Sequence, residues 1–439
     1  MTRYSHFLFC SILGISFLNC GSKKSTQPPA SGPVQLYQKN GAAADDELGS
    51  SVASAGDVNG DGKADFIVGA SGADPGGLSS AGSAYVYSGA TGALLYQKDG
   101  AAAGDALGAS VAGAGDVNGD GNTDFIVGAI FADPGGLGTA GEAYVYSGAN
   151  GALLHQKGGI APGYVFGISV AGVGDLNSDA KADFIIGAYG TAGGRGAAYL
   201  YSGATGALLY SKSGAAAGDN LGYSVAGAGD MNGDGKADFI IGARLADPGG
   251  LSAAGSAYVY SGANGALLYQ KDGAAGDTLG FSVAGAGDVN GDGKADFLIG
   301  AFGADPGGLS AAGSAYVYSG ADGSLLYQKN GAAAGDQLGS SVASAGDVNG
   351  DGKADFVIGA SSADPGGLSA TGSAYVYSGA TGSLLYQKNG AAAGDNLGNS
   401  VAGAGDVDGD GKADFIIGVP FTDPGGLSAA GSAYVISIR

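Results

Sequence analysis

Short runs of apolar and small residues recur along the chain and are separated by turns rich in Gly, Asp and Asn. Residues 277–334 show the unit well, with runs at 280–287, 295–301, 314–320 and 325–329 that read GFSVAGAG, ADFLIGA, SAYVYSG and LLYQK. Runs of this length with β-branched and aromatic residues, bounded by turn residues, predict β-strands. The pattern therefore predicts four short strands per unit, the first built of small residues and the second of apolar ones.

The unit repeats seven times. The phrase GDVNGDG or a close variant begins at spacings of 55 to 59 residues, at Gly56, Gly115, Gly174, Gly229, Gly287, Gly346 and Gly405. Four-stranded units at such a long period are typical of the blades of a propeller. The sequence therefore predicts an all-β fold, a seven-bladed β-propeller over residues 33–439.

The two ends of the repeat region complement each other. The last unit stops at its third strand, SAYVISIR, without a following LLYQK run, while a matching run, QLYQKNG, occupies residues 35–41 before the first unit. An N-terminal strand that completes the last blade would close the ring and cover an exposed sheet edge. Small residues in the first strand of each unit suit the crowded centre of such a ring.

Composition supports strands and turns over helices. The 439 residues include 92 Gly, and Gly inside a helix costs about 1 kcal/mol relative to Ala. The combination of 45% hydrophobic and 13% charged residues argues against a disordered chain. A net charge of −21 lacks the basic surface that nucleic acids require, so no nucleic-acid partner is expected. Acidity by itself favours solubility, and the positions of the acids decide whether it also serves cation binding.

Each repeat carries a loop of the form D-x-[N/D]-x-D-G-x-x-D between its first two strands. Calcium prefers several oxygen ligands in a small, adaptable cage, and alternate positions of a tight loop can turn inward. Asp, Asn and Gly also favour plain turns, but that preference does not explain three acids at fixed offsets in seven copies. The sequence predicts up to seven Ca²⁺ sites, with side-chain or carbonyl ligands at Asp57, Asn59, Asp61, Lys63, Asp65, Asp116, Asn118, Asp120, Asn122, Asp124, Asp175, Asn177, Asp179, Lys181, Asp183, Asp230, Asn232, Asp234, Lys236, Asp238, Asp288, Asn290, Asp292, Lys294, Asp296, Asp347, Asn349, Asp351, Lys353, Asp355, Asp406, Asp408, Asp410, Lys412 and Asp414.

Two details limit this prediction. An EF-hand needs Glu at position 12 of its loop, whereas position 12 is Val or Ile in every copy, as at Val68. That position belongs to a buried strand, so the EF-hand interpretation fails. The third loop has Ala180 in place of the Gly, and it can bind only if φ stays negative or strain is tolerated. Of the 40 acidic residues, 22 occupy ligand positions, and seven Ca²⁺ would bring the net charge from −21 to −7.

These loops and strands resemble the FG-GAP repeats of integrin alpha-chain propellers and their bacterial relatives. The family pattern is an FG or LG doublet, then GD-x-NGDG-x-x-D, then a hydrophobic strand ending in GAP. Here Phe166-Gly167 gives the doublet, Leu107-Gly108 gives its LG form, and Val419-Pro420 keeps the Pro. The resemblance covers residues 33–439. It implies a seven-bladed ring with calcium in the loops, ligand binding on the opposite face, and a role in cell adhesion or extracellular recognition.

The N-terminus has the layout of an export signal. An apolar run at residues 7–18 follows Arg3 and is too short to span a bilayer comfortably. Cys20 at its end resembles a bacterial lipobox of a relaxed kind, with ordinary cleavage as the alternative. We expect a signal peptide at 1–19, a lipid on Cys20 that anchors the protein to a membrane, a flexible linker at 20–32, and an exported bacterial lipoprotein of the outer membrane or cell surface.

The third unit differs from the others and offers a possible partner site. It carries His155 in place of Tyr, Tyr164 in place of Asp, Tyr189, and Arg195 in a shortened loop. An aromatic and basic spot in an acidic ring is one interpretation, and sequence drift in one blade is the other. Acids in the loops away from the calcium, such as Asp46 and Asp74, are interpreted as loop caps rather than as a ligand ring.

The leading functional prediction is an adhesion or ligand-binding module with an extracellular protein or glycan partner. The alternative is a glycan-binding lectin, in which Tyr would have to replace the missing Trp. A polysaccharide-active enzyme is less favoured, because His155 is the one His beyond the export signal and near-identical blades offer no differentiated acid–base pair. We expect no catalytic residue, and we expect a monomer.

Overall fold

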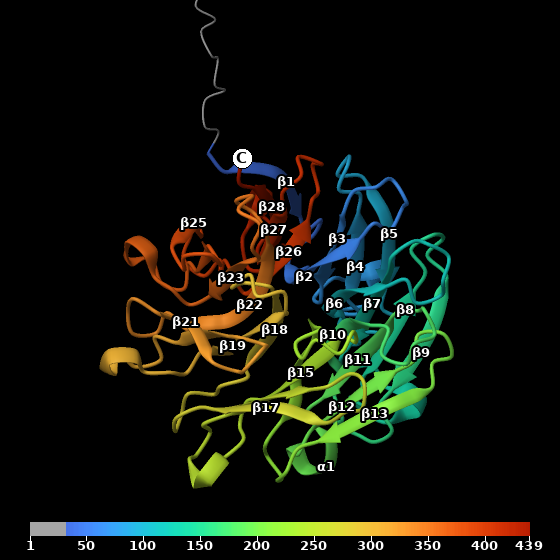
Figure 1. The fold of residues 1–439 in the computed structure, drawn as a ribbon. Helices are drawn as coiled ribbons and strands as arrows, with labels where there is room; N and C mark the ends of the chain where they lie inside the picture. Colours follow the sequence, from blue (N-terminus) through green and yellow to red (C-terminus); the bar gives the residue numbers. More distant parts are fainter. Residues whose placement is uncertain (1–31) are drawn as a thin grey trace, which may run out of the picture.

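The computed structural model describes residues 32–439. The strands form seven four-stranded antiparallel sheets arranged around a ring (Figure 1). In the first blade, β2 (Leu48–Gly56), β3 (Asp65–Ala70), β4 (Ser83–Tyr87) and β5 (Leu94–Asp99) pair in that order. The all-β propeller with seven blades is therefore confirmed. The predicted signal peptide, the lipid on Cys20 and most of the linker lie outside the described residues.

The next five blades repeat this order. Their strands are β6 (Leu107–Gly115), β7 (Asp124–Ala129), β8 (Glu142–Tyr146) and β9 (Leu153–Gly158); β10 (Phe166–Gly174), β11 (Asp183–Ala188), β12 (Ala197–Tyr201) and β13 (Leu208–Ser213); β14 (Leu221–Gly229), β15 (Asp238–Ala243), β16 (Ser256–Tyr260) and β17 (Leu267–Asp272); β18 (Ser282–Gly287), β19 (Asp296–Ala301), β20 (Ser314–Tyr318) and β21 (Leu325–Asn330); and β22 (Leu338–Gly346), β23 (Asp355–Ala360), β24 (Ser373–Tyr377) and β25 (Leu384–Asn389). Blade three also holds one short helix, α1 (Thr191–Gly194), and the other blades have a 3-10 turn at the Pro-Gly-Gly of the same loop.

The seventh blade joins the two ends of the described chain, as predicted. It consists of β26 (Ser400–Gly405), β27 (Asp414–Val419), β28 (Ser432–Ser437) and β1 (Val34–Asn40), with β1 at its outer edge. The register of β1 against β28 runs from Val34 opposite Ser437 to Asn40 opposite Ser432, and Figure 1 shows the blue strand beside the red ones. This strand ties the ring closed.

Contacts between blades repeat around the ring and involve the fourth strand. The Tyr37 hydroxyl of β1 donates to the carbonyl of Gly89 in the next blade at 2.7 Å, and Lys39 Nζ donates to the Gly92 carbonyl at 2.6 Å. The Tyr37 ring also stacks on the buried ring of Phe66, with centroids 5.8 Å apart. Apolar clusters of this kind fill the space between neighbouring blades, so the core is divided into repeated units that join adjacent sheets.

The first strand of each blade lies at the centre, as its small residues predict. First strands of adjacent blades contact one another directly, for example β2 and β6. A Cβ on Gly113 of β6 would lie 2.9 Å from the Ser54 carbonyl oxygen of β2, which is closer than side chains normally approach. Gly is therefore required there because two backbones come close together.

The predicted division of the loops between two faces is also present. The Asp-rich loop of blade one is bonded to the turn between β4 and β5 through Asp65 and Gly89. At the other end of the strands, the Gly72 N–H donates to the Asp46 carbonyl, which joins the loop after β3 to the loop before β2. We refer to these as the metal-loop face and the opposite face. No helix within residues 32–439 is both long and apolar enough to cross a membrane.

Candidate functional site

The first carboxylate of each Asp-rich loop organises the loop backbone. In blade one, Asp57 Oδ1 accepts hydrogen bonds from the N–H groups of Gly60 and Asp61 at 2.8 and 3.0 Å, and its Oδ2 accepts from Gly62 at 2.8 Å. Asn59 Oδ1 accepts from the Asp61 N–H at 2.9 Å. The same bonds recur in the other loops, for example around Asp288. The loop is therefore held in a tight coil with its oxygen-bearing side chains drawn together.

The last Asp of each loop has a structural role that the sequence analysis did not predict. Asp65 is fully buried, and its Oδ2 accepts from Val58 N–H at 2.9 Å. Its Oδ1 accepts from the N–H of Gly89, 24 residues further on, at 2.8 Å. The same link is made by Asp124, Asp183, Asp238, Asp296 and Asp355. This residue thus fastens the loop to the neighbouring turn, and the lone pairs left on its oxygens are those available to a cation.

The seventh loop lacks the hydrogen bond between its last Asp and the neighbouring turn. Its oxygen atoms therefore show whether the loop residues fit a cation. Ile438 stands where the other blades have the Gly of that turn. The buried Asp414 Oδ1 has no hydrogen bond of normal geometry within residues 32–439, although the Ser437 hydroxyl is near enough to oppose the rise in the pKa of Asp414. Carboxylate oxygens of Asp406, Asp408 and Asp414 lie within 4.8 Å of one another. An unpaired buried carboxylate oxygen beside two further carboxylates is a donor set that fits Ca²⁺. Asp408 also forms an ion pair with Arg439, at 2.6 Å.

Burial disfavours the ionised form of the last Asp in the metal loops. Desolvation raises the pKa of Asp65, and it raises the pKa values of Asp124, Asp355 and Asp414 to about 6. Backbone hydrogen bonds oppose this rise, while neighbouring loop carboxylates add to it. A bound divalent cation would favour the ionised form of these groups.

The third loop adopts the same coil with two residues in the left-handed region. Ala180 has φ of +63° and Ser178 has φ of +64°, where the other loops have Gly. Asp175 still accepts from the N–H groups of Ser178, Asp179 and Ala180. The negative φ that would have avoided strain is absent, so this loop keeps its shape at the cost of an unfavourable backbone.

Lysines of the metal loops connect neighbouring blades, which the sequence did not reveal. Lys63 Nζ donates to the Asp408 carbonyl of blade seven at 2.6 Å, and Lys353 Nζ donates to the Asn290 carbonyl at 2.7 Å. The sequence predicts that these lysines bind Ca²⁺ through their backbone carbonyl oxygen and assigns no role to their side chains. Lys181 and Lys236 make the same kind of contact, so Lys side chains join four of the loops to the loop of the preceding blade.

On the opposite face, the repeated acids cap loops, as interpreted from the sequence. Asp46 Oδ2 accepts from the N–H groups of Ala42 and Ala43, both at 2.8 Å. Asp74 Oδ1 accepts from the Ser80 N–H at 2.6 Å. The equivalent acids of the other repeats make corresponding bonds, for example Asp105 and Asp305. These side chains hold loops in place and do not form a free acidic ring.

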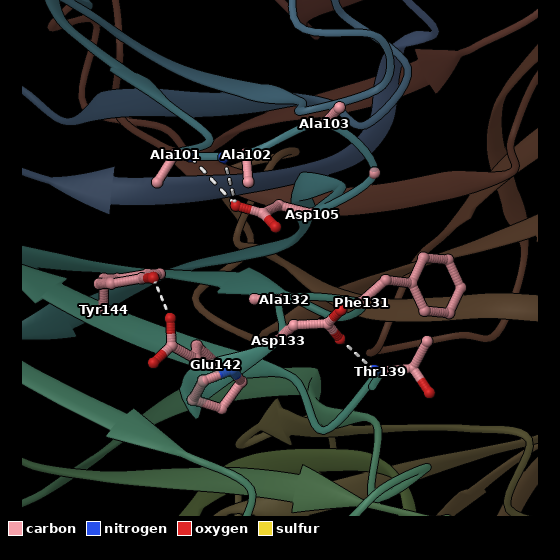
Figure 2. Close-up of a pocket in the computed structure, with 12 residues that line it drawn as sticks. Ala101, Ala102, Ala103, Asp105, Phe131, Ala132, Asp133, Thr139, Glu142 and Tyr144 are labelled. Atoms are coloured by element: carbon pink, nitrogen blue, oxygen red, sulfur yellow. Dashed lines mark hydrogen bonds between the residues drawn. The ribbon is translucent and has the colours of Figure 1, made fainter. Parts of the chain in front are cut away.

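Blade two carries a hollow on this face (Figure 2). Its volume is about 640 Å³, compared with about 200 Å³ for the equivalent hollow in blade one. Glu142 occurs here where blade one has Ser83, and it accepts hydrogen bonds from the Tyr144 hydroxyl and from Gln156. Phe131 lines the hollow and is 45% exposed. This hollow combines carboxylate and aromatic groups that the sequence analysis did not single out.

The four odd residues noted in the sequence do not form one site, and His155 belongs to β9 of blade two rather than to the third unit. His155 stacks on Phe184 and its Nε2 contacts the Gly203 carbonyl at 2.6 Å, so it takes the place of the usual Tyr near the metal-loop face. Tyr164 lines a small hollow at the other end of the strands. Tyr189 packs on Tyr223, and Arg195 is exposed in the loop that follows α1.

A search against models of protein families matches the FG-GAP repeat at residues 48–87, 107–146, 221–260, 279–318, 338–377 and 397–436. These six segments cover more than half of the chain. The chain belongs to the FG-GAP repeat family. The unmatched repeat is the third, which carries Ser178 and Ala180 in its loop.

Characterised proteins that are similar to this chain include integrin alpha chains. Mouse integrin alpha-E is 37% identical over 150 residues, which are 29% of this chain and 13% of the relative. Chicken integrin alpha-V is 33% identical over 218 residues, 45% of this chain and 20% of the relative. Integrin alpha-4 of Xenopus laevis is 30% identical over 166 residues, 35% and 16% respectively. The aligned segments span at most a fifth of these relatives.

Proposed function

We propose that this FG-GAP propeller is a calcium-dependent adhesion or ligand-binding module of the bacterial cell surface or outer membrane, exported and anchored by a lipid on Cys20. It is proposed to act as a monomer and to bind an extracellular protein, without catalysis. The relationship to integrin alpha chains supports the class of function. The tight Asp-rich loops, with one unpaired buried carboxylate oxygen at Asp414, support the calcium.

Calcium would serve as a structural element of the ring. The residues that would hold it are the loop oxygens of the seven repeats, and the ion would supply positive charge to carboxylates that burial otherwise disfavours. Six of the seven loops are joined to their own turn through the last Asp, and lysines such as Lys353 join loops to the preceding blade. Binding to the loops would therefore stiffen the metal-loop face and leave the opposite face for a ligand.

The hollow of blade two is the observation that carries the ligand-binding role. The hollow offers space of about 640 Å³, an exposed aromatic ring at Phe131, and a carboxylate at Glu142 where blade one has Ser83. Concave sites with a few polar groups among apolar ones are the usual form of ligand pockets. We propose that the partner contacts this hollow.

The test is a binding screen with the purified full-length protein against extracellular matrix proteins and a glycan array, with and without EDTA. Glu142→Ser gives blade two the residue that blade one has at this position, and we expect a loss of about tenfold in affinity, corresponding to one charge-assisted hydrogen bond. Asp99→Asn is the control, since blade five carries Asn330 at the equivalent place. Equal binding by both variants would exclude the hollow.

Other outcomes of the screen bear on the wider proposal. Binding confined to glycans would favour a lectin, because Phe131 and Tyr144 offer aromatic rings beside carboxylates. Absence of binding to either class would contradict the module role. Hydrolysis of a polysaccharide by the pure protein would overturn the expectation that it is not an enzyme.

A further inference from the structure

An aromatic and basic patch interrupts the repeat in blades three to five. We define the mouth patch as Tyr189, Tyr223, Arg244, Phe281 and Phe302, all half-buried. Tyr189, Arg244 and Phe302 each follow the last residue of the second strand of their blade. Tyr223 lies near the start of the first, central strand β14, and Phe281 directly precedes β18, the first strand of its blade. All five positions are therefore at the inner end of the opposite face, around the mouth of the ring. Blades one and six have Ser at both equivalent positions, at Ser50, Ser71, Ser340 and Ser361.

The patch is a continuous set of contacts across three blades. Tyr189 packs on Tyr223 with centroids 5.6 Å apart, Tyr223 packs on Phe281 at 5.1 Å, and Phe281 packs on Phe302 at 4.2 Å. These ring pairs are tilted by 42 to 56°. Aromatic pairs prefer offset or edge-to-face arrangements over a face-to-face sandwich, so these contacts are favourable ones.

Arg244 is the charged member of the patch, and its side chain has no hydrogen-bond partner among the described residues. Its guanidinium lies over the Tyr223 ring at 3.9 Å and near the Phe281 ring at 5.8 Å. Its Nε is buried without a hydrogen bond, and within residues 32–439 the recorded ion pair belongs to Arg439 rather than to Arg244. Buried donors in folded proteins normally have acceptors, so an unpaired Arg on an aromatic cluster indicates a group that the isolated chain does not supply.

The geometry points to the carboxylate of a partner protein as that group. We propose that Arg244 binds an isolated acidic residue or a C-terminal carboxylate, and that the surrounding aromatic rings receive the apolar residue next to it. A carboxylate can accept from Nε and one terminal nitrogen of Arg at the same time. Tyr, Phe and Arg are also enriched in the cores of protein interfaces.

The rest of the molecule favours a single carboxylate over a polyanion. The chain has a net charge of −21, and a string of uronates or phosphates would be repelled by this field. One acidic residue among apolar neighbours avoids most of that repulsion while it pairs with Arg244. This inference deepens the proposed function and rests on it, since it names a second contact point and the chemistry of the protein that docks there.

The test uses small probes and the full-length protein in calcium. The probes are N-acetyl-Leu-Asp-Phe-amide, its Asn analogue, N-acetyl-Leu-Phe with a free C-terminus, and D-glucuronate, followed by saturation-transfer NMR and titration. We expect the Asp peptide, the free C-terminus or both to bind about tenfold more tightly than the Asn peptide. Arg244→Gln should reduce that ratio to about one, and Arg244→Lys should retain part of it because the charge remains.

Arg195→Gln is the matched control, because Arg195 is an exposed Arg in blade three outside the patch. It should leave the ratio unchanged, and equal melting temperatures of the variants would show that they are folded. An unchanged ratio in Arg244→Gln, or no binding of any peptide, would overturn the inference. Arg244-dependent binding of glucuronate alone would replace the protein partner with an acidic sugar. If a partner from the binding screen binds Arg244→Gln as well as wild type, the inference fails while the proposed function stands.

Discussion

Replacing Asp296 by Asn separates the structural role of the last loop carboxylate from a role in metal binding. Asp296 is fully buried, and its Oδ2 accepts from Val289 and Asn290 at 2.8 and 3.2 Å. Its Oδ1 accepts from Gly320 at 3.0 Å. An Asn side chain has one oxygen, so its better orientation keeps the first two bonds and turns its NH₂ toward the N–H of Gly320.

The expected cost has two parts. One unpaired buried N–H costs about 1–3 kcal/mol, and this loss should occur in chelator as well as in calcium. If Asp296 is also a calcium ligand, the variant loses the stabilisation from that site, which is about 2.7 kcal/mol when free calcium is 100 times the dissociation constant. The free energy of unfolding should therefore fall by about 1–3 kcal/mol in EDTA and by about 4–6 kcal/mol in calcium.

The assay is guanidinium denaturation of the full-length protein under both conditions. Asp305→Asn is the control, since Asp305 is exposed, lies on the opposite face of the same blade, and accepts one backbone N–H that an Asn oxygen can still accept. It should change stability by less than about 0.5 kcal/mol in either condition. An equal loss for Asp296→Asn in calcium and in EDTA would refute the ligand role, and a loss no larger than that of the control would refute the hydrogen-bond argument.

Three further substitutions test other parts of the ring. Ala180→Gly should stabilise the protein by about 1 kcal/mol in denaturation experiments, because φ of +63° strains Ala; a destabilisation would contradict the left-handed conformation. Tyr37→Phe should cost about 1 kcal/mol, since its hydroxyl bond is 2.7 Å long, and Tyr210→Phe should cost less because its bonds are 3.4–3.5 Å; the reverse order would argue against the closing contact. His155→Tyr should leave ligand binding unchanged in the binding screen, because His155 occupies the place of a structural Tyr; a loss of binding would restore it as a partner residue.

The strands, the blade count and the closing strand followed from local sequence pattern. The alternation of residues and the repeat period predict each strand and its place in the blade. The QLYQKNG run lies before the first repeat instead of after the last one, which predicts that it pairs with SAYVIS. The division of loops between two faces followed from the antiparallel order. These features can be predicted because they depend on residues that are close in sequence, and because seven copies of the repeat show the same pattern.

Contacts between distant residues could not be obtained in this way. The Asp65–Gly89 link spans 24 residues, and the Lys63 contact with Asp408 joins the first and last blades. His155 and Tyr164 are close in sequence, but His155 belongs to β9 of blade two and lies near the metal-loop face, whereas Tyr164 lies at the other end of the strands. The mouth patch combines side chains of three blades, each of which looks like an isolated substitution in the sequence.

Calcium in the Asp-rich loops is the central claim, and metal analysis together with thermal unfolding tests it most directly. The full-length protein would be dialysed against calcium, analysed for bound metal, and melted with and without chelator. The account predicts several Ca²⁺ per chain, up to seven, and a melting temperature that falls when chelator is added. Protein without bound calcium, with the same melting curve in chelator, would contradict it.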